Sequence, residues 1–168
     1  IENLPVMCYL AEPTPPFAPI FTSSALETFG YTLDEWRSSA DVWLNAIHPD
    51  DRERVIAETT AAKLAGKDID YEYRLIARDG TEYWVQDRGR FLLDADGKPA
   101  CWLGVMIDVT DRRKAEECLR ESEMRHRTVF EGANDIIYVH DLEGNYRSVN
   151  GAVERILGYT PEKVLSMN

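Results

Sequence analysis

Cysteines and long apolar runs are scarce in this sequence, and each shortage narrows the class of protein. The 168 residues include three cysteines, Cys8, Cys101 and Cys118. Their wide spacing without a C-x-x-C pair predicts reduced thiols rather than disulfides. No apolar run approaches the length of a bilayer span, and no signal peptide opens the chain. We therefore expect a cytoplasmic protein without direct membrane contact.

Basic residues are also in short supply. The chain has 19 Lys and Arg against 30 Asp and Glu, a net charge of -11. An acidic surface repels nucleic-acid phosphates and anionic lipids, so we expect no nucleic-acid partner. With 44% hydrophobic and 29% charged residues, the composition is that of an ordinary globular chain.

The sequence contains no catalytic signature. Its three histidines are far apart, and it has no H-E-x-x-H, no G-x-S-x-G and no phosphate-binding glycine loop. His126-Arg127-Thr128 resembles a phosphoacceptor box but lacks the following acid and the later proline, so we exclude it. Asp79, Asp96 and Asp141 fall in tight turns, where carboxylates are common, and predict no metal site. We expect that this chain is not itself an enzyme.

Hydrophobic periodicity predicts an α+β domain. Short strands are predicted at 6–11 and 20–23, short helices at 25–29, 33–37 and 41–47, and a longer helix from Pro49 to about Gly66. Period-two alternation then predicts three consecutive antiparallel strands at 69–77, 83–93 and 100–109. The last is almost continuously apolar, which predicts a central strand covered on both faces.

A charged helix is predicted from Thr110 to about Glu131. Thr110 suits the N-cap, and Asp111 places an anion at the positive end of the helix. A thin heptad seam runs through Ala115, Leu119, Ser122, His126, Val129 and Ala133. Two readings remain open: a solvated connector, or a short parallel coiled coil that carries a signal. In the second reading the relay residues are Asp108, Thr110, Leu119, Ser122 and His126.

The end of the sequence repeats its beginning. Residues 29–36 recur as 157–164, an offset of 128 (158 minus 30), and residues 6–11 match 135–140. The second copy stops before its three long strands. The chain also begins at Ile1 without a methionine, so we expect it to be a piece of a longer protein.

Eight short motifs occur along the first copy in one order: Gly30-Tyr31-Thr32 with Glu35, Ile47-His48-Pro49-Asp50-Asp51, Tyr71-Glu72-Tyr73-Arg74, Asp79-Gly80, Tyr83-Trp84-Val85, Gly97-Lys98-Pro99, Gly104, and Asp108-Val109-Thr110. Together they resemble a PAS domain with its PAC tail, of the variety common in bacterial sensor histidine kinases. The resemblance implies a PAS fold: a five-stranded antiparallel sheet, order 2-1-5-4-3, with short helices on one face. It also implies a PAS/PAC domain at 1–110, a signalling helix at 111–132 and the N-terminal part of a second PAS domain at 133–168.

The resemblance also bears on ligands. Flavin-binding members carry a cysteine in the helix that matches 41–47, and haem-binding members a histidine in the one that matches 49–65. This chain has neither, so we expect neither cofactor, and His48 is expected to fix the turn before Pro49. A cup could hold a small apolar or aromatic molecule, although such residues more often simply fill a core. Its predicted lining is Trp43, Ile47, Val55, Tyr71, Tyr73, Phe91 and Trp102.

These inferences predict a cytosolic sensory and signal-relay module of a histidine kinase or, alternatively, of a cyclic-dinucleotide enzyme. A ligand-free structural dimerisation module is the competing hypothesis. In either case we expect a homodimer through the linker helix and the incomplete second copy. The apolar residues of that copy should pack against the first domain or another protomer: Ile136, Ile137, Val139, Ile156 and Leu157.

Overall fold

A five-stranded antiparallel sheet forms the frame of the first part of the chain. The computed structural model describes residues 6–14 and 17–167. The strand order is β2-β1-β5-β4-β3, which confirms the order that the sequence resemblance implies. The strands are β1 (Val6–Ala11), β2 (Pro19–Thr22), β3 (Ile69–Ile76), β4 (Glu82–Leu93) and β5 (Pro99–Asp108).

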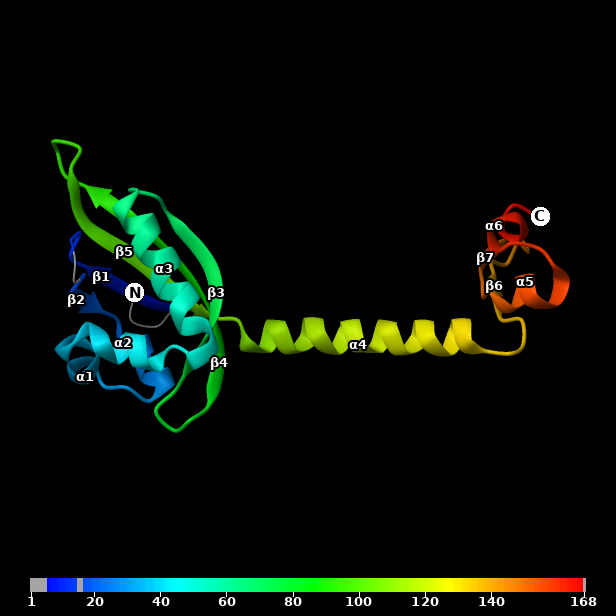
Figure 1. Ribbon diagram of the computed structural model, residues 1–168, viewed down its shortest axis with the longest axis horizontal. Helices are drawn as coiled ribbons and strands as arrows, with labels where there is room; N and C mark the ends of the chain where they lie inside the picture. The colour runs from blue at the N-terminus through cyan, green and yellow to red at the C-terminus, as the bar shows by residue number, and fades with distance from the viewer. Residues whose placement is uncertain (1–5, 15–16, 168) are drawn as a thin grey trace. The chain divides into compact units, whose positions relative to one another are not determined.

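Four helices follow β2 and lie over one face of this sheet (Figure 1): η1 (Ser24–Phe29), α1 (Leu33–Ser38), α2 (Ala40–Ala46) and α3 (Pro49–Leu64). The core fills the space between these two layers. Tyr73 and Leu75 of β3 and Val85 of β4 point into it and are fully buried. Leu26, Ile47 and further helical residues meet them from the other side.

The prediction that β5 is covered on both faces is wrong. Trp102 and Met106 are buried, whereas the alternate residues Leu103, Val105 and Ile107 are only partly buried. Because the helices cover one face of the sheet, only every second residue of β5 enters the core. The apolar character of the strand therefore overstates its burial.

The start of α3 is fixed by local hydrogen bonds. His48 Nδ1 accepts a hydrogen bond from the Asp50 amide (3.2 Å), and Pro49 occupies the first helical position. Asp51 Oδ1 and Oδ2 each accept a hydrogen bond of 2.9 Å from the Arg74 guanidinium on β3. His48 thus caps the turn, as expected, and α3 is anchored to the sheet at its first turn.

The chain divides into two compact units, residues 1–113 and 114–168, and α4 (Thr110–Gly132) contains the boundary. The second unit continues with β6 (Tyr138–His140), β7 (Tyr146–Val149), α5 (Ala152–Leu157) and α6 (Pro161–Leu165). A small apolar cluster of Val149, Val153 and Val164 holds these elements together.

The sequence repeat is also a repeat of structure. Gly30 and Gly158 end η1 and α5 with left-handed backbone, φ of 76° and 73°, which glycine adopts without steric cost. Two residues later, the hydroxyls of Thr32 and Thr160 cap α1 and α6. The second unit therefore repeats the opening of the first unit in its helix caps as well as in its amino-acid sequence.

Candidate functional site

Asp87 is a buried carboxylate on the helix-covered face of the sheet. It lies on β4, opposite Tyr71 on β3 and Met106 on β5, and its residue is 2% exposed. Its Oδ1 accepts a hydrogen bond from the Tyr9 hydroxyl (2.9 Å), and its Oδ2 accepts one from the Tyr73 hydroxyl (3.2 Å). Side chains from β1 and β3 therefore converge on one acid of β4.

Each tyrosine is held in turn by a tryptophan. Trp43 Nε1 on α2 donates to the Tyr73 hydroxyl at 3.0 Å, and Trp102 Nε1 on β5 donates to the Tyr9 hydroxyl at 3.4 Å. Both hydroxyls thus use their protons toward Asp87 and receive a second hydrogen bond from an indole. The result is a polar network inside an aromatic surrounding, in which each member orients the next.

Two glycines allow this arrangement. A Cβ on Gly104 would lie 2.1 Å from the Tyr9 ring, and one on Gly89 would lie 2.4 Å from the Trp102 ring. The Tyr9 ring of β1 lies over Gly104 of β5, its partner in the sheet. The Trp102 ring of β5 lies over Gly89 of β4, which pairs with Gly104. Any side chain at either position would displace a ring that supports Asp87.

Burial dominates the electrostatics of Asp87. It raises the pKa of the carboxyl to about 6, although the hydrogen bonds from Tyr9 and Tyr73 and the charge of Lys63 act in the opposite direction. Burial also raises the pKa of both tyrosines well above the ordinary value. Lys63 of α3 is partly buried, and this lowers the pKa of its ammonium to about 8.

A cavity of about 230 Å³ adjoins this network. Its wall includes Tyr9 and Asp87 of the sheet, Trp36 and Trp43 of the short helices, and Lys63 of α3. This volume is below the roughly 300–1,000 Å³ of pockets that hold drug-sized ligands, so any occupant is small. Thr22 also lines the cavity, and within the described residues its buried hydroxyl has no hydrogen-bond partner.

Of the seven residues predicted to form the cup, Trp43 lines this cavity. Ile47, Val55, Tyr71 and Tyr73 pack in the main core, and Phe91 and Trp102 in a second cluster. Tyr73 and Trp102 reach the site through their hydrogen bonds. Six of the seven residues thus belong to the packing of these two clusters rather than to the wall of the cavity.

Neither charged residue of the cavity wall, Asp87 or Lys63, was predicted from the sequence. The sequence pattern could have identified Asp87 as a site residue, because Asp87 occupies an inward-facing position of β4 between Val85 and Phe91. An acid at such a position requires buried partners. Lys63 gave no signal, since a lysine near the end of a polar helix is normally solvated.

The junction between β5 and α4 is tied to β4. Val109 N donates to the Trp84 carbonyl (2.8 Å), and Trp84 N donates to the Thr110 hydroxyl (2.9 Å). The prediction that Thr110 caps α4 is therefore wrong: Thr110 is already helical, and its hydroxyl is used by the neighbouring strand. Asp108 Oδ1 instead accepts the hydrogen bond of the Thr110 amide (2.9 Å).

Charged contacts reinforce this junction. Both carboxylate oxygens of Glu72 on β3 accept hydrogen bonds of 2.6 Å, one from Arg112 and one from Arg113. Burial alone would raise the pKa of Glu72, but these hydrogen bonds outweigh it and the pKa is lowered. The Arg113 guanidinium also lies 4.6 Å from the centroid of the Trp84 ring. The first turn of α4 is thereby fastened to β3 and β4.

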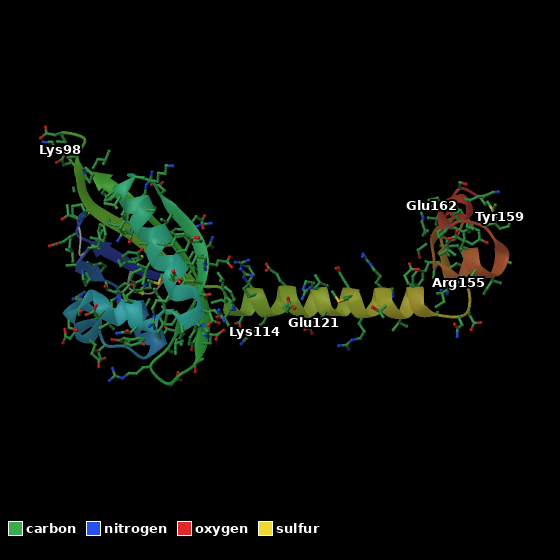
Figure 2. All side chains as sticks on the ribbon, viewed as in Figure 1. Lys98, Lys114, Glu121, Arg155, Tyr159 and Glu162 are labelled. Carbon is green, nitrogen blue, oxygen red and sulfur yellow. The ribbon has the colours of Figure 1, made fainter. Side chains whose placement is uncertain are left out.

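Beyond this turn, the side chains of α4 are exposed except for Phe130, which is half-buried. Figure 2 shows them standing away from the helix, Lys114 and Glu121 among them. The predicted seam residues Ser122 and His126 are exposed, as are Leu119 at 61% and Val129 at 66%. His126 stacks on Phe130 with ring centroids 6.1 Å apart. Within one chain, the seam therefore has no partner helix among the described residues.

Two other site classes can be assessed. Within the described part of the chain, His, Cys, Asp and Glu side chains form no group of three that could hold a metal ion. Every helix in the same residues is too short or too polar to traverse a lipid bilayer.

Comparisons with known families match both units. A family model described as a PAS fold matches residues 20–106, which is more than half of the chain. A second, described as a PAS domain, matches residues 124–167.

Two curated relatives are a two-component sensor and a histidine kinase. The Two-component sensor PprA of Pseudomonas aeruginosa is 29% identical over 171 residues, covering 98% of this chain and 18% of that protein. The Blue-light-activated histidine kinase of Brucella anthropi is 37% identical over 101 residues, covering 59% of this chain and 20% of that protein. The chain thus spans no more than a fifth of the length of either relative.

Solved structures give the same fold. A Sensory Box Histidine Kinase/Response Regulator from Burkholderia thailandensis is 31% identical with a TM-score of 0.57, covering 73% of this chain and 91% of that one. The N-terminal domain of a diguanylate cyclase with PAS/PAC sensor from Marinobacter aquaeolei has 23% identity and a TM-score of 0.59, covering 64% and 98%. A light-oxygen-voltage domain studied with a flavin analogue has 23% identity and a TM-score of 0.57, covering 70% and 87%. The last two share the fold alone.

Proposed function

The chain belongs to the PAS domain family, and from this premise we propose that residues 6–113 sense a small molecule in their cavity and pass the response to α4. The chain is a sensory module of the kind found in two-component sensors and histidine kinases. The observation that carries the proposal is the cavity itself, with the buried Asp87 in its wall. A core whose only role was packing would be expected to fill this volume with apolar side chains.

The cavity does not suit haem or a cysteine-linked flavin. Its wall contains no histidine and no cysteine within the described residues, and His48 is engaged at the start of α3. Cys8 lines a separate concavity beside Phe21 and Leu103, and Cys118 lies on α4. The volume of about 230 Å³ is also small for either group. The proposal therefore includes neither haem nor a cysteine-linked flavin.

The route to α4 runs through the sheet. Asp87 lies on β4, and three residues earlier on the same strand Trp84 bonds to Val109 and Thr110. A shift of β4 that accompanies ligand binding would move the first turn of α4, because Arg113 and Glu72 fasten that turn to the sheet. We place the relay in this short path and its output in α4.

The parent protein is proposed to be a histidine kinase, as its sensor relatives suggest. A cyclic-dinucleotide enzyme is the alternative, supported by the fold shared with the diguanylate cyclase sensor. This chain supplies the sensing and relay parts in either case.

A purely structural dimerisation module is the second candidate function. The exposed apolar residues of the second unit favour it, since Ile156 and Leu157 are 54% and 57% exposed and Val139 is 53% exposed. A chain that leaves such residues uncovered is expected to pair with another copy. Dimerisation is compatible with sensing. It would be the sole function only if the cavity binds no ligand.

The experiment compares small molecules released from freshly purified protein by mass spectrometry. Ile56 of α3 lines the cavity, so Ile56→Trp should block it, and Trp43→Ala should widen it and loosen binding. Leu64→Trp is the matched control, because Leu64 is 72% exposed on the same helix. Sensing predicts a molecule bound to the wild type and to the control but absent from Ile56→Trp. The same small-molecule content in all variants would leave only the structural module.

A further inference from the structure

Asp87 and Lys63 place opposite charges on the wall of one cavity without pairing with each other. Asp87 comes from β4 and Lys63 from α3, and both line the same space. An ion pair requires a carboxylate oxygen within 4.0 Å of the ammonium nitrogen. Within the described residues, no carboxylate oxygen lies that close to Lys63 Nζ. The ammonium instead lies 4.0 Å from the centroid of the Phe17 ring and 5.0 Å from that of Trp102.

Both groups retain unused hydrogen-bonding capacity. An ionised carboxylate offers about four acceptor positions, and Asp87 uses two of them for Tyr9 and Tyr73. An ammonium has three donors, and within the described residues those of Lys63 meet aromatic faces rather than hydrogen-bond acceptors. The buried Thr22 hydroxyl, which lines the same cavity, is a third polar group without a partner in the described chain.

A wholly apolar ligand would exclude water from these groups and replace none of their hydrogen bonds, which is unfavourable. A simple amine would satisfy Asp87 but bring a second cation near Lys63. A simple carboxylic acid would satisfy Lys63 but bring a second anion near Asp87. A molecule with both charges compensates both sites, and the aromatic walls of Trp36 and Trp43 suit an ammonium and an apolar side chain alike.

We propose that this cavity binds a small zwitterion of the amino-acid type, with its ammonium on Asp87 and its carboxylate on Lys63. The inference rests on the proposed sensing function and names its ligand class. The volume of about 230 Å³ restricts the ligand to a free amino acid or a molecule of that size. The Thr22 hydroxyl lines the same cavity and supplies a further hydrogen-bonding group for the ligand.

The test uses matched probes that share one side chain: L-leucine with 3-methylbutylamine and 4-methylpentanoate, L-methionine with its amine and acid counterparts, and L-phenylalanine with phenethylamine and 3-phenylpropanoate. Binding to the 168-residue chain is measured by calorimetry and by thermal shift after dialysis. At least one amino acid should bind about tenfold or more tightly than its own amine and acid counterparts, as expected for losing one charged hydrogen-bonded contact.

Substitutions of Lys63 and Asp87 test which charged end of the ligand each residue binds. Lys63→Met keeps an aliphatic side chain of similar length and should weaken the amino acid about tenfold to a hundredfold while leaving the amine unaffected or tighter. Asp87→Asn should weaken the amino acid and the amine but not the acid. Lys98→Met and Asp96→Asn, on the exposed β4–β5 hairpin, are the matched controls and should bind like the wild type.

The outcomes separate this inference from the sensing function. If amines or acids bind as tightly as the amino acids, or Lys63→Met changes nothing, the zwitterion assignment falls and the cavity remains a ligand site. If no amino acid binds although a different molecule is released from the wild type and not from Ile56→Trp, the ligand class is likewise wrong. If nothing binds and nothing is released from any variant, the sensing function falls with it.

Discussion

The hydroxyl of Thr110 accepts a hydrogen bond from the backbone amide of Trp84, with 2.9 Å between Oγ1 and N. The first residue of α4 is thereby bonded to β4, the strand that also carries Asp87. Because Thr110 is 8% exposed, water cannot readily replace this bond. The junction is thus a fixed attachment between the sheet and the helix rather than a free hinge.

Thr110→Val should destabilise the first unit by about 1–3 kcal/mol, since it leaves the Trp84 amide buried without an acceptor. Valine keeps the shape and the β-branching of threonine, so helix propensity changes little. Thr128→Val on the exposed part of α4 is the matched control and should remain within about 0.5 kcal/mol of the wild type. Urea unfolding provides the measurement. Equal stabilities for the two variants would mean that the Trp84 amide finds another partner.

The pH dependence of stability should carry the signature of Asp87. Its folded pKa of about 6 lies above the ordinary 3.8, so the folded state binds this proton more tightly than the unfolded state. The contribution of Asp87 to stability is then greatest below about pH 4 and falls as pH rises toward 6, by about 3 kcal/mol in all. Asp51 and Glu72, whose pKa values are lowered, act in the opposite direction.

Comparison with Asp87→Asn isolates this contribution. The stability of the wild type relative to Asp87→Asn should decrease between about pH 4 and pH 6, while Asp96→Asn on the exposed hairpin should follow the wild type. Lys63→Met should shift this decrease in stability to higher pH, because the charge of Lys63 lowers the pKa of Asp87. Parallel stability curves for wild type and Asp87→Asn would contradict a raised pKa.

The seam of α4 should respond to apolar substitution. Polar residues at core positions weaken a coiled coil and keep alternative packings accessible, and Ser122 and His126 occupy two successive positions of the predicted seam. Replacing both with leucine should tighten a homodimer and lock the output of the proposed parent kinase in one state. Sedimentation measures the first effect and autophosphorylation the second. Glu121→Leu with Arg125→Leu, off the seam on the same helix, is the control. If both pairs act alike, α4 is only a connector.

Asp108→Ala should disrupt the coupling between the cavity and the output without affecting dimer formation. It removes the acceptor of the Thr110 amide (2.9 Å) without touching the seam. We expect unchanged dimer dissociation in sedimentation and an autophosphorylation that no longer responds to cavity variants such as Ile56→Trp. A weakened dimer would instead place Asp108 in the assembly surface.

The fold was largely predictable from sequence, whereas the site was not. Alternation in 69–77 and 83–93 predicted β3 and β4, but the strand order came from resemblance, because pairing of distant strands leaves no local pattern. Thr110 was misassigned as a cap since its partner Trp84 is 26 residues away. Trp43, which was predicted to line a cup, is in the wall of the cavity, and Asp87 could have been found as an acid on an apolar face. Lys63 could not, because its burial depends on Phe17 and Trp102 from distant elements.

The central claim, that the state of the cavity reaches α4 through β4, is tested most directly by hydrogen exchange at the amides of residues 113–117. Ile56→Trp fills the cavity and stands in for ligand occupancy. This substitution is expected to change exchange at the start of α4 in the wild-type background, but not in the Thr110→Val background, where the hydrogen bond from the Trp84 amide is lost. No change in either background, or the same change in both, would contradict it.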